Sequence, residues 1–145
     1  MIRIDLMNNP DSVLKPIIVL DLDNTLIYTD YELDELYTYY RPGLKVFINS
    51  LLIYADLAIF TAGTQEYADP IINNIETLCE KKDLFKKRLF RQNCVKSILN
   101  DNLYYKNLGD YFPLERTLIV DDNADAVIPH PENSIIITPF YKTII

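Results

Sequence analysis

The sequence contains little cysteine and fewer positive charges than negative ones. Cys79 and Cys94 are the only cysteines of its 145 residues, and neither belongs to a CxxC pair. This spacing offers no cysteine zinc site and no redox motif, so we expect two reduced core thiols in an intracellular protein. Fourteen Lys and Arg stand against 21 Asp and Glu, which gives a net charge of −7. An acidic chain repels phosphate backbones, which argues against direct binding of nucleic acid.

Long hydrophobic runs, internal repeats and linker-like segments are also absent. The first 16 residues, MIRIDLMNNPDSVLKP, hold no continuous apolar core of a signal peptide, and the later run LLIYADLAIF is short and interrupted by Asp56. We therefore expect a protein that is neither secreted nor membrane-spanning. No break in composition divides the chain, so we expect residues 1–145 to form a single domain around one core.

Four short apolar runs alternate with longer segments of helical period. Pro42 and Gly43 precede a stretch whose apolar residues recur at helical spacing, and a second helix is predicted from near Thr64, with Pro70 close to its start. Strands separated by helices favour an α/β fold with a mostly parallel sheet. The four predicted strands are residues 17–20, 57–60, 117–120 and 134–138.

Polar residues follow the first three runs directly, and two of these runs end in paired carboxylates. In an extended chain Asp21 and Asp23 project to the same side, and Asp121 and Asp122 end another strand. If these strands are neighbours, up to four carboxylates surround one site, a charge that Mg²⁺ with its oxygen ligands would offset. The alternative is a turn in which the aspartates cap backbone amides.

The motifs DLDNT, a threonine after LAIF, Lys106 and VDD, in this order, resemble the four motifs of the haloacid dehalogenase superfamily of phosphohydrolases. The further stretches RPG, YADP, RLFRQNCV, YYKNL and HPEN resemble the small phosphatases that act on the C-terminal domain of RNA polymerase II, the NLI-interacting-factor-like branch. The resemblance covers residues 16–140. It implies a three-layer, Rossmann-like fold with helices on both faces of the sheet and no large cap domain.

The resemblance also implies how the aspartates divide the work. Asp21 would be the nucleophile that becomes an aspartyl-phosphate, and Asp23 would protonate the leaving alcohol and then deprotonate water. Mg²⁺ would be held by Asp21, the backbone carbonyl of Asp23, and Asp122. A like charge nearby favours protonation of one carboxyl group, which agrees with these roles.

Other positions match the phosphate site of the superfamily. The phosphate would be bound by Thr61, the adjoining amide of Ala62, and Lys106. Thr25 would support the loop that carries Asp23, and Asp121 would support the metal's waters and Lys106. The segment before Lys106 is longer than in the branch, so Lys96 stays an alternative for the phosphate-binding lysine.

Two residues match substrate-contacting positions of the branch, Tyr67 and Arg91. Tyr67 could instead pack at the start of a helix, and Arg91 could instead form a structural ion pair. His130 is the only histidine, and the implied mechanism requires no imidazole. Gly63 stands where the branch has a serine.

Two segments allow two interpretations each. Residues 28–40, rich in tyrosine and acid, form either a flap over the strand ends or an ordered surface crossing. Residues 81–91 hold six of the 14 basic residues, and they form either a solvated helix face or a patch that attracts an acidic phosphopeptide.

The spacing of the motifs leaves little room for an inserted cap, and an open site admits a phosphorylated side chain of a protein. We therefore expect a Mg²⁺-dependent phosphoserine or phosphothreonine phosphatase whose substrate is a phosphoprotein or phosphopeptide. The polymerase tail is a candidate substrate, and a nuclear location follows from resemblance alone. A small-molecule phosphomonoesterase and a catalytically idle phosphoprotein-binding module remain the alternatives.

Overall fold

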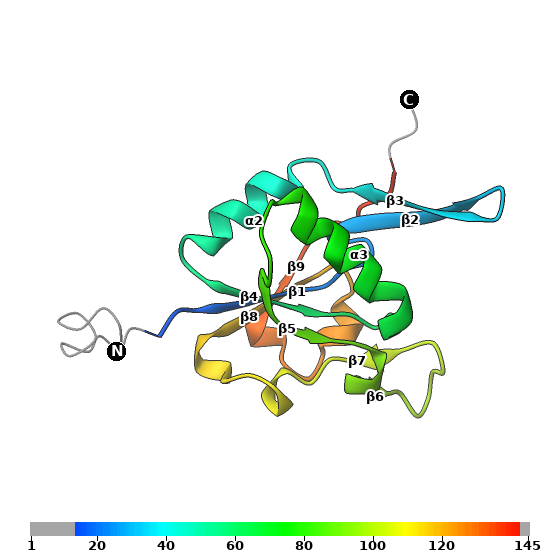
Figure 1. Cartoon of the computed structure of the whole chain (residues 1–145). Helices are drawn as coiled ribbons and strands as arrows, with labels where there is room; N and C mark the ends of the chain where they lie inside the picture. Colours follow the sequence, from blue (N-terminus) through cyan, green and yellow to red (C-terminus); the bar gives the residue numbers. More distant parts are fainter. Residues whose placement is uncertain (1–13, 143–145) are drawn as a thin grey trace.

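The centre of the molecule is a five-stranded parallel sheet (Figure 1). The computed structural model describes residues 14–142. The strands lie in the order β5-β4-β1-β8-β9, and every neighbouring pair is parallel. This arrangement confirms the predicted α/β fold with a mostly parallel sheet. The strands are β1 (Ile17–Leu20), β4 (Asp56–Phe60), β5 (Phe85–Leu89), β8 (Thr117–Asp121) and β9 (Ser134–Ile136).

Strand β5 lies within the basic segment 81–91 and forms one edge of the sheet beside β4. A solvated helix face, one of the two interpretations of this segment, is therefore wrong. Phe85 and Leu89 are buried at the two ends of β5, whereas Lys86 and Lys87 between them are exposed. The apolar ends anchor the strand in the core while the lysines keep their charges in water.

Two α-helices cover one face of the sheet, α2 (Leu44–Leu52) and α3 (Gln65–Leu78). Gly43 precedes α2 with a φ of 84°, a left-handed conformation that glycine adopts without steric cost. Thr64 begins α3 as predicted, because its hydroxyl oxygen accepts a hydrogen bond from the backbone N–H of Tyr67. The buried side chains under these helices include Leu20, Leu57, Ile59, Ile48, Ile72 and Ile75.

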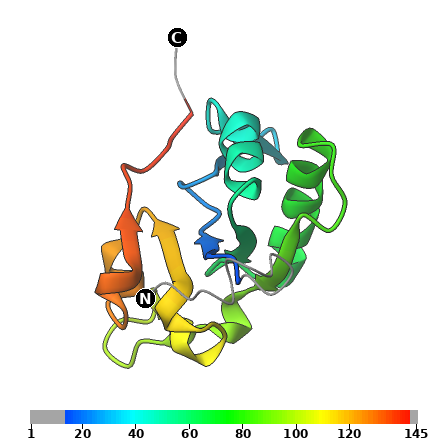
Figure 2. The same cartoon turned by 90° about the vertical axis from the view of Figure 1, so that its left-hand side faces the viewer.

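The opposite face is covered by short 3₁₀ helices, so that the sheet is the middle of three layers (Figure 2). Val19, Phe60 and Ile119 of the sheet pack there against side chains of these helices and their connections, including Leu108 and Val127. The 3₁₀ helices are η2 (Arg91–Asn93), η3 (Leu108–Asp110), η4 (Leu114–Arg116), η5 (Ala124–Val127) and η6 (Pro131–Asn133).

Two antiparallel hairpins stand apart from the main sheet (Figure 1). Strands β2 (Ile27–Glu32) and β3 (Glu35–Tyr40) form the larger one, which accounts for the tyrosine-rich segment 28–40. Strands β6 (Val95–Lys96) and β7 (Tyr104–Tyr105) form the smaller one. Between β1 and β4 the chain contains only the larger hairpin and α2, so no cap domain is inserted there.

No helix within residues 14–142 combines the length and the apolar character needed to cross a membrane.

Candidate active site

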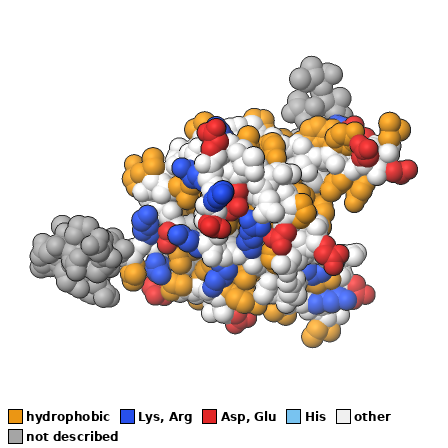
Figure 3. Space-filling model, viewed as in Figure 1, with side chains coloured by type: hydrophobic (Ala, Val, Ile, Leu, Met, Phe, Trp, Pro, Cys, Tyr) orange, Lys and Arg blue, Asp and Glu red, His pale blue; other side chains and the backbone are white. Residues whose placement is uncertain are grey.

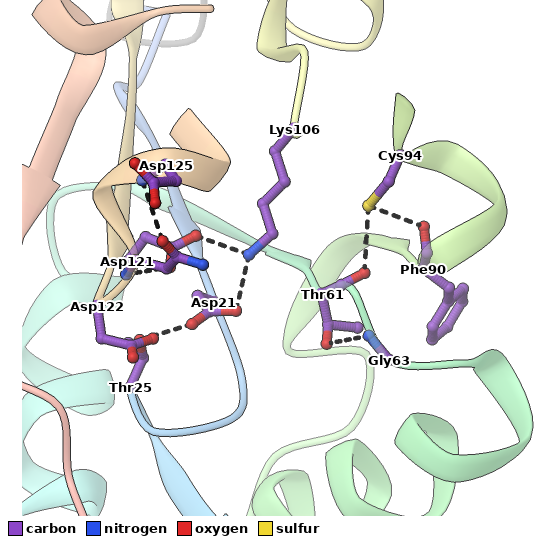
Figure 4. A network of polar contacts seen from close by, with 11 residues as sticks. Asp21, Thr25, Thr61, Gly63, Phe90, Cys94, Lys106, Asp121, Asp122 and Asp125 are labelled. Atoms are coloured by element: carbon purple, nitrogen blue, oxygen red, sulfur yellow. Dashed lines mark hydrogen bonds and ion pairs between the residues drawn. The ribbon is translucent and has the colours of Figure 1, made fainter. Parts of the chain in front are cut away.

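The carboxyl ends of three neighbouring strands meet at one cleft (Figure 4). Leu20 of β1 pairs in register with Ile59 of β4 and Val120 of β8, so the residues that follow these strands come together. Parallel α/β sheets bind ligands at such carboxyl ends. The cleft has a volume of about 180 Å³, and its lining includes Asp21, Asp23, Thr61, Ala62, Lys106, Asp121 and Asp122.

Lys106 lies at the centre of this cleft. Its Nζ is 2.7 Å from Asp21 Oδ1 and 2.7 Å from Asp121 Oδ2, and only 2% of its side chain is exposed. The backbone N–H of Lys106 donates to the carbonyl of Ala126, which fixes the segment that carries the lysine. Lys96, the alternative, is exposed and lies 3.8 Å from Asp101. The structure therefore brings Lys106, and not Lys96, to the carboxylates.

Asp21 is held in its ionised form by its neighbours. Its Oδ2 accepts a hydrogen bond of 2.8 Å from the Thr25 hydroxyl, and its backbone N–H donates to the carbonyl of Val120. Burial tends to raise the pKa of Asp21, but the charge of Lys106 and the hydrogen bonds that the carboxylate receives outweigh burial and lower it. Burial likewise tends to lower the pKa of Lys106, whereas the adjacent carboxylates raise it above its ordinary value. The Asp21 carboxylate is therefore anionic, and it lies beside the positively charged Lys106.

A third carboxylate, that of Asp122, lies beside the two that pair with Lys106. Oxygen atoms of Asp21, Asp121 and Asp122 lie within 4.8 Å of one another. Burial raises the pKa of Asp121 to about 6, and burial together with Asp21 raises the pKa of Asp122 to about 7. Three clustered carboxylates beside one lysine leave an excess of negative charge when all are ionised, and the donors are hard oxygen atoms. The residues present therefore fit Mg²⁺, and Asp121, expected only as a supporting residue, contributes its carboxylate to the cluster.

Asp23 faces a different group of side chains. The Tyr67 hydroxyl donates a hydrogen bond to Asp23 Oδ1 and lies 2.8 Å from the Thr29 hydroxyl of β2. Burial raises the pKa of Asp23, although the tyrosine bond opposes this shift. Because the Asp23 carboxylate points to Tyr67, its contribution to a metal would come from the backbone carbonyl. Its raised pKa favours the protonated form relative to an ordinary aspartate, as a general acid requires.

Gly63 allows Tyr67 to take this position. A Cβ on Gly63 would lie 3.0 Å from Tyr67 Cδ2 and 3.3 Å from Thr61 Oγ1, closer than ordinary contacts. A side chain at position 63 would therefore fit only if the tyrosine ring moved by a few tenths of an ångström.

The loop after β4 offers donors for a phosphate. The Thr61 hydroxyl oxygen accepts a 3.0 Å hydrogen bond from the Gly63 N–H, and the Thr61 N–H donates to the carbonyl of Leu89. Within the described part of the chain the N–H of Ala62 has no such acceptor. The Thr61 hydroxyl proton and the Ala62 N–H are accordingly free to face an anion in the cleft.

Arg91 borders a second hollow that adjoins the cleft and is also lined by Asp23, Thr29 and Tyr67. Its Nε donates to the carbonyl of Ala62 at 2.8 Å, and its guanidinium lies 5.0 Å from the centre of the Tyr104 ring. Among residues 14–142 it forms no ion pair, so the structural ion pair considered for it is absent there.

The structure adds residues that sequence reasoning missed. The cleft is also lined by Asn102 and Leu103 of the β6–β7 connection, by Tyr104 of β7, and by Asn123 after the paired aspartates. Asn123 could have been found from its place directly after VDD, but nothing in the sequence pointed to the connection. His130 lies outside the cleft, where its Nε2 is 2.7 Å from Asn107 Oδ1.

A five-stranded parallel sheet that gathers paired aspartates, a threonine and a buried lysine at its carboxyl ends defines a haloacid-dehalogenase-like phosphohydrolase fold. Within this class, residues 16–144 match the NLI interacting factor-like phosphatase family, and the chain belongs to that family.

Curated relatives agree with this family assignment, and a solved structure agrees with the fold. CTD small phosphatase-like protein 1 of Caenorhabditis elegans is 30% identical over 91% of this chain and 29% of its own length. Nuclear envelope morphology protein 1 of Schizosaccharomyces pombe is 33% identical over 81% of this chain and 28% of its own. The structure of Fcp1, an essential RNA polymerase II CTD phosphatase, matches with a TM-score of 0.71 at 21% identity, over 88% of this chain and 42% of that one. The chain thus spans less than a third of the first two relatives, and the Fcp1 structure bears on the fold alone.

Proposed function

We propose that this chain is a Mg²⁺-dependent phosphatase that hydrolyses phosphoserine or phosphothreonine on a protein, within a single domain. The observation that carries the proposal is the buried Lys106 between Asp21 and Asp121, in the same cleft as Asp23, whose pKa burial raises. Turnover of p-nitrophenyl phosphate in the presence of Mg²⁺ tests the activity. Binding of phosphopeptide without any turnover would favour the idle binding module instead.

The proposed reaction has two displacements. A carboxylate oxygen of Asp21 bonds to phosphorus, the bond from phosphorus to the leaving oxygen breaks, and the proton of Asp23 passes to that oxygen. Asp23 then removes a proton from water, whose oxygen bonds to phosphorus and releases Asp21 and inorganic phosphate. Lys106, the Thr61 hydroxyl and the Ala62 N–H offset the charge on the phosphoryl oxygens. Mg²⁺, held by Asp21, Asp122 and the Asp23 carbonyl, would supply further charge stabilisation.

The shape of the site supports a protein substrate. The cleft adjoins the hollow lined by Thr29, Tyr67 and Arg91, and the described chain inserts no cap domain over either. An open site suits an extended peptide, whereas a small metabolite is usually enclosed. Relatives named as phosphatases of the RNA polymerase II C-terminal domain make that tail one candidate substrate, with a nuclear location. A phosphometabolite that outperforms every phosphopeptide would favour the small-molecule alternative.

Mg²⁺ should stabilise the protein as well as activate it. At a concentration ten times its dissociation constant, Mg²⁺ should add about 1.4 kcal/mol to the free energy of unfolding. We expect Asp122→Asn to reduce this gain, because the cluster loses one of its three carboxylates. Thermal unfolding with and without Mg²⁺ measures the effect, and exposed Asp125→Asn is the matched control. An identical Mg²⁺ shift in Asp122→Asn, or full activity in EDTA, would contradict the metal assignment.

Arg91→Ala should separate large substrates from small ones. We expect a loss of roughly tenfold in kcat/KM on a phosphopeptide and a smaller loss on p-nitrophenyl phosphate, because remote contacts supply binding energy only to the larger substrate. Added salt should weaken the peptide reaction more, since exposed charges are screened beyond about 8 Å at physiological ionic strength. Equal losses on both substrates would place Arg91 in the phosphate site, through its bond to Ala62.

Arg88 provides the comparison from the same basic segment. It forms ion pairs of 2.9 Å with Asp69 and 3.0 Å with Glu76 of α3. Arg88→Ala should therefore lower the melting temperature and leave the ratio of the two activities unchanged.

A further inference from the structure

The connection between β6 and β7 holds two adjacent aliphatic side chains almost entirely in solvent. Ile98 is 97% exposed and Leu99 is 98% exposed. Burial of one such side chain stabilises a folded protein by about 1.5–3 kcal/mol. In their exposed positions Ile98 and Leu99 do not contribute this free energy to folding. Scattered exposed hydrophobic residues are ordinary, but an adjacent pair beside a reaction cleft marks a candidate contact surface.

The turn that carries these two side chains is internally hydrogen-bonded. The Ser97 hydroxyl oxygen accepts hydrogen bonds from the N–H groups of Leu99 and Asn100. At the base of the turn the Ser97 N–H donates to the carbonyl of Leu103, and the Leu103 N–H donates to the carbonyl of Asn100. Because the turn is built before any partner arrives, contact with Ile98 and Leu99 requires little additional ordering of the loop.

The same connection forms one wall of the catalytic cleft. Leu103 and Tyr104 line the cleft, and the Tyr104 ring lies beneath the Arg91 guanidinium. The Ser97 N–H donates to the carbonyl of the cleft-lining Leu103, and Ile98 and Leu99 directly follow Ser97 in the chain. A substrate chain that extends from the cleft across this connection would meet the aliphatic pair.

We propose that Ile98 and Leu99 bind an apolar side chain of the phosphoprotein substrate, within about four residues of the phosphorylated residue at an extended rise of roughly 3.3 Å each. The proposal rests on the proposed function and adds a sequence preference to it. The preferred substrate then has a hydrophobic residue close to its phosphoserine.

A lipid surface fits this region less well than a protein does. The chain carries a net charge of −7, and Asp101 belongs to the same connection. On a different part of the surface the β2–β3 hairpin carries Asp30, Glu32, Asp34 and Glu35, two of which pair with Lys142, and Figure 3 shows acidic and hydrophobic side chains together on it. Anionic membranes repel a chain of net negative charge.

The test is a panel of phosphoserine peptides in which a single leucine is moved from about four residues before the phosphoserine to about four residues after it, with serine elsewhere. At one or two positions the leucine should raise kcat/KM roughly tenfold. The double variant I98S/L99S should lose this preference and keep its turnover of p-nitrophenyl phosphate. The matched double variant V46S/I53S, with exposed side chains on and just after α2, should retain the preference.

The outcomes separate the two proposals. Hydrolysis of the peptides with no leucine preference, or with the same preference in I98S/L99S, overturns this inference and leaves the phosphatase proposal intact. Turnover of p-nitrophenyl phosphate without turnover of any peptide overturns the protein substrate and this inference with it. Binding of phosphatidylserine vesicles that I98S/L99S abolishes, with peptide kinetics unchanged, would assign the pair to a membrane instead.

Discussion

Asp21→Asn should lower phosphatase turnover by more than about 10³-fold while leaving the protein folded. The amide has almost the volume of the carboxylate but is a far weaker nucleophile. Its carbonyl oxygen can still accept from Thr25 or Lys106, and Lys106 keeps its ion pair with Asp121. The melting temperature should therefore change little, because the substitution also removes one of three crowded negative charges.

The covalent step gives this prediction a second measurement. Wild-type protein quenched in acid during turnover of a ³²P-labelled substrate should retain label that hydroxylamine releases, as expected of an acyl phosphate, and Asp21→Asn should retain none. Asp125→Asn, the same exchange at an exposed position nearby, should behave as wild type. Normal turnover or normal labelling in Asp21→Asn would rule out Asp21 as the nucleophile.

Lys106→Met should damage both stability and activity. The methionine fills much of the space of the lysine but leaves the buried carboxylates of Asp21 and Asp121 without their cation. Removal of one partner of a buried ion pair typically costs about 3–5 kcal/mol. For a domain of this size the melting temperature should fall by roughly 10 °C. Turnover measured where the variant is folded should fall at least about 100-fold, because a donor to the phosphoryl oxygens is lost.

Two further variants separate the two effects of Lys106. K106M/D121N removes one of the stranded carboxylates, so it should regain part of the lost stability without regaining activity. Lys96→Met replaces the exposed lysine of the neighbouring hairpin and should alter neither property. Near-normal turnover in Lys106→Met together with loss in Lys96→Met would reverse the assignment of the phosphate-binding lysine.

The sheet and the assembly of the cleft follow from local features of the sequence. β1, β4 and β8 are continuous apolar runs that end abruptly in polar residues, and parallel strands bring such ends to one edge. The gathering of Asp21, Thr61 and Asp121 therefore needed no tertiary information beyond strand order.

Features that depend on how distant segments return to the sheet were not predictable. The sequence of β5 does not look like a buried strand, because lysines occupy its middle. An edge strand needs only its two apolar ends in the core. The contacts of Arg91 with Ala62 and Tyr104 join residues that no sequence pattern pairs. The residues that would contact the substrate are thus harder to predict from sequence than the catalytic residues.

The central position of β1 has a consequence for when the site can exist at all. β1 pairs on one side with β8, about 100 positions later in the chain, and Asp121 and Lys106 reach Asp21 only through that pairing. Contacts this distant in sequence form late, after a large loss of loop entropy. A nascent or truncated chain that lacks β8 would carry Asp21 and Thr61 but neither the lysine's anchor nor the cluster of carboxylates. The appearance of phosphatase activity would therefore report that nearly the whole domain has folded.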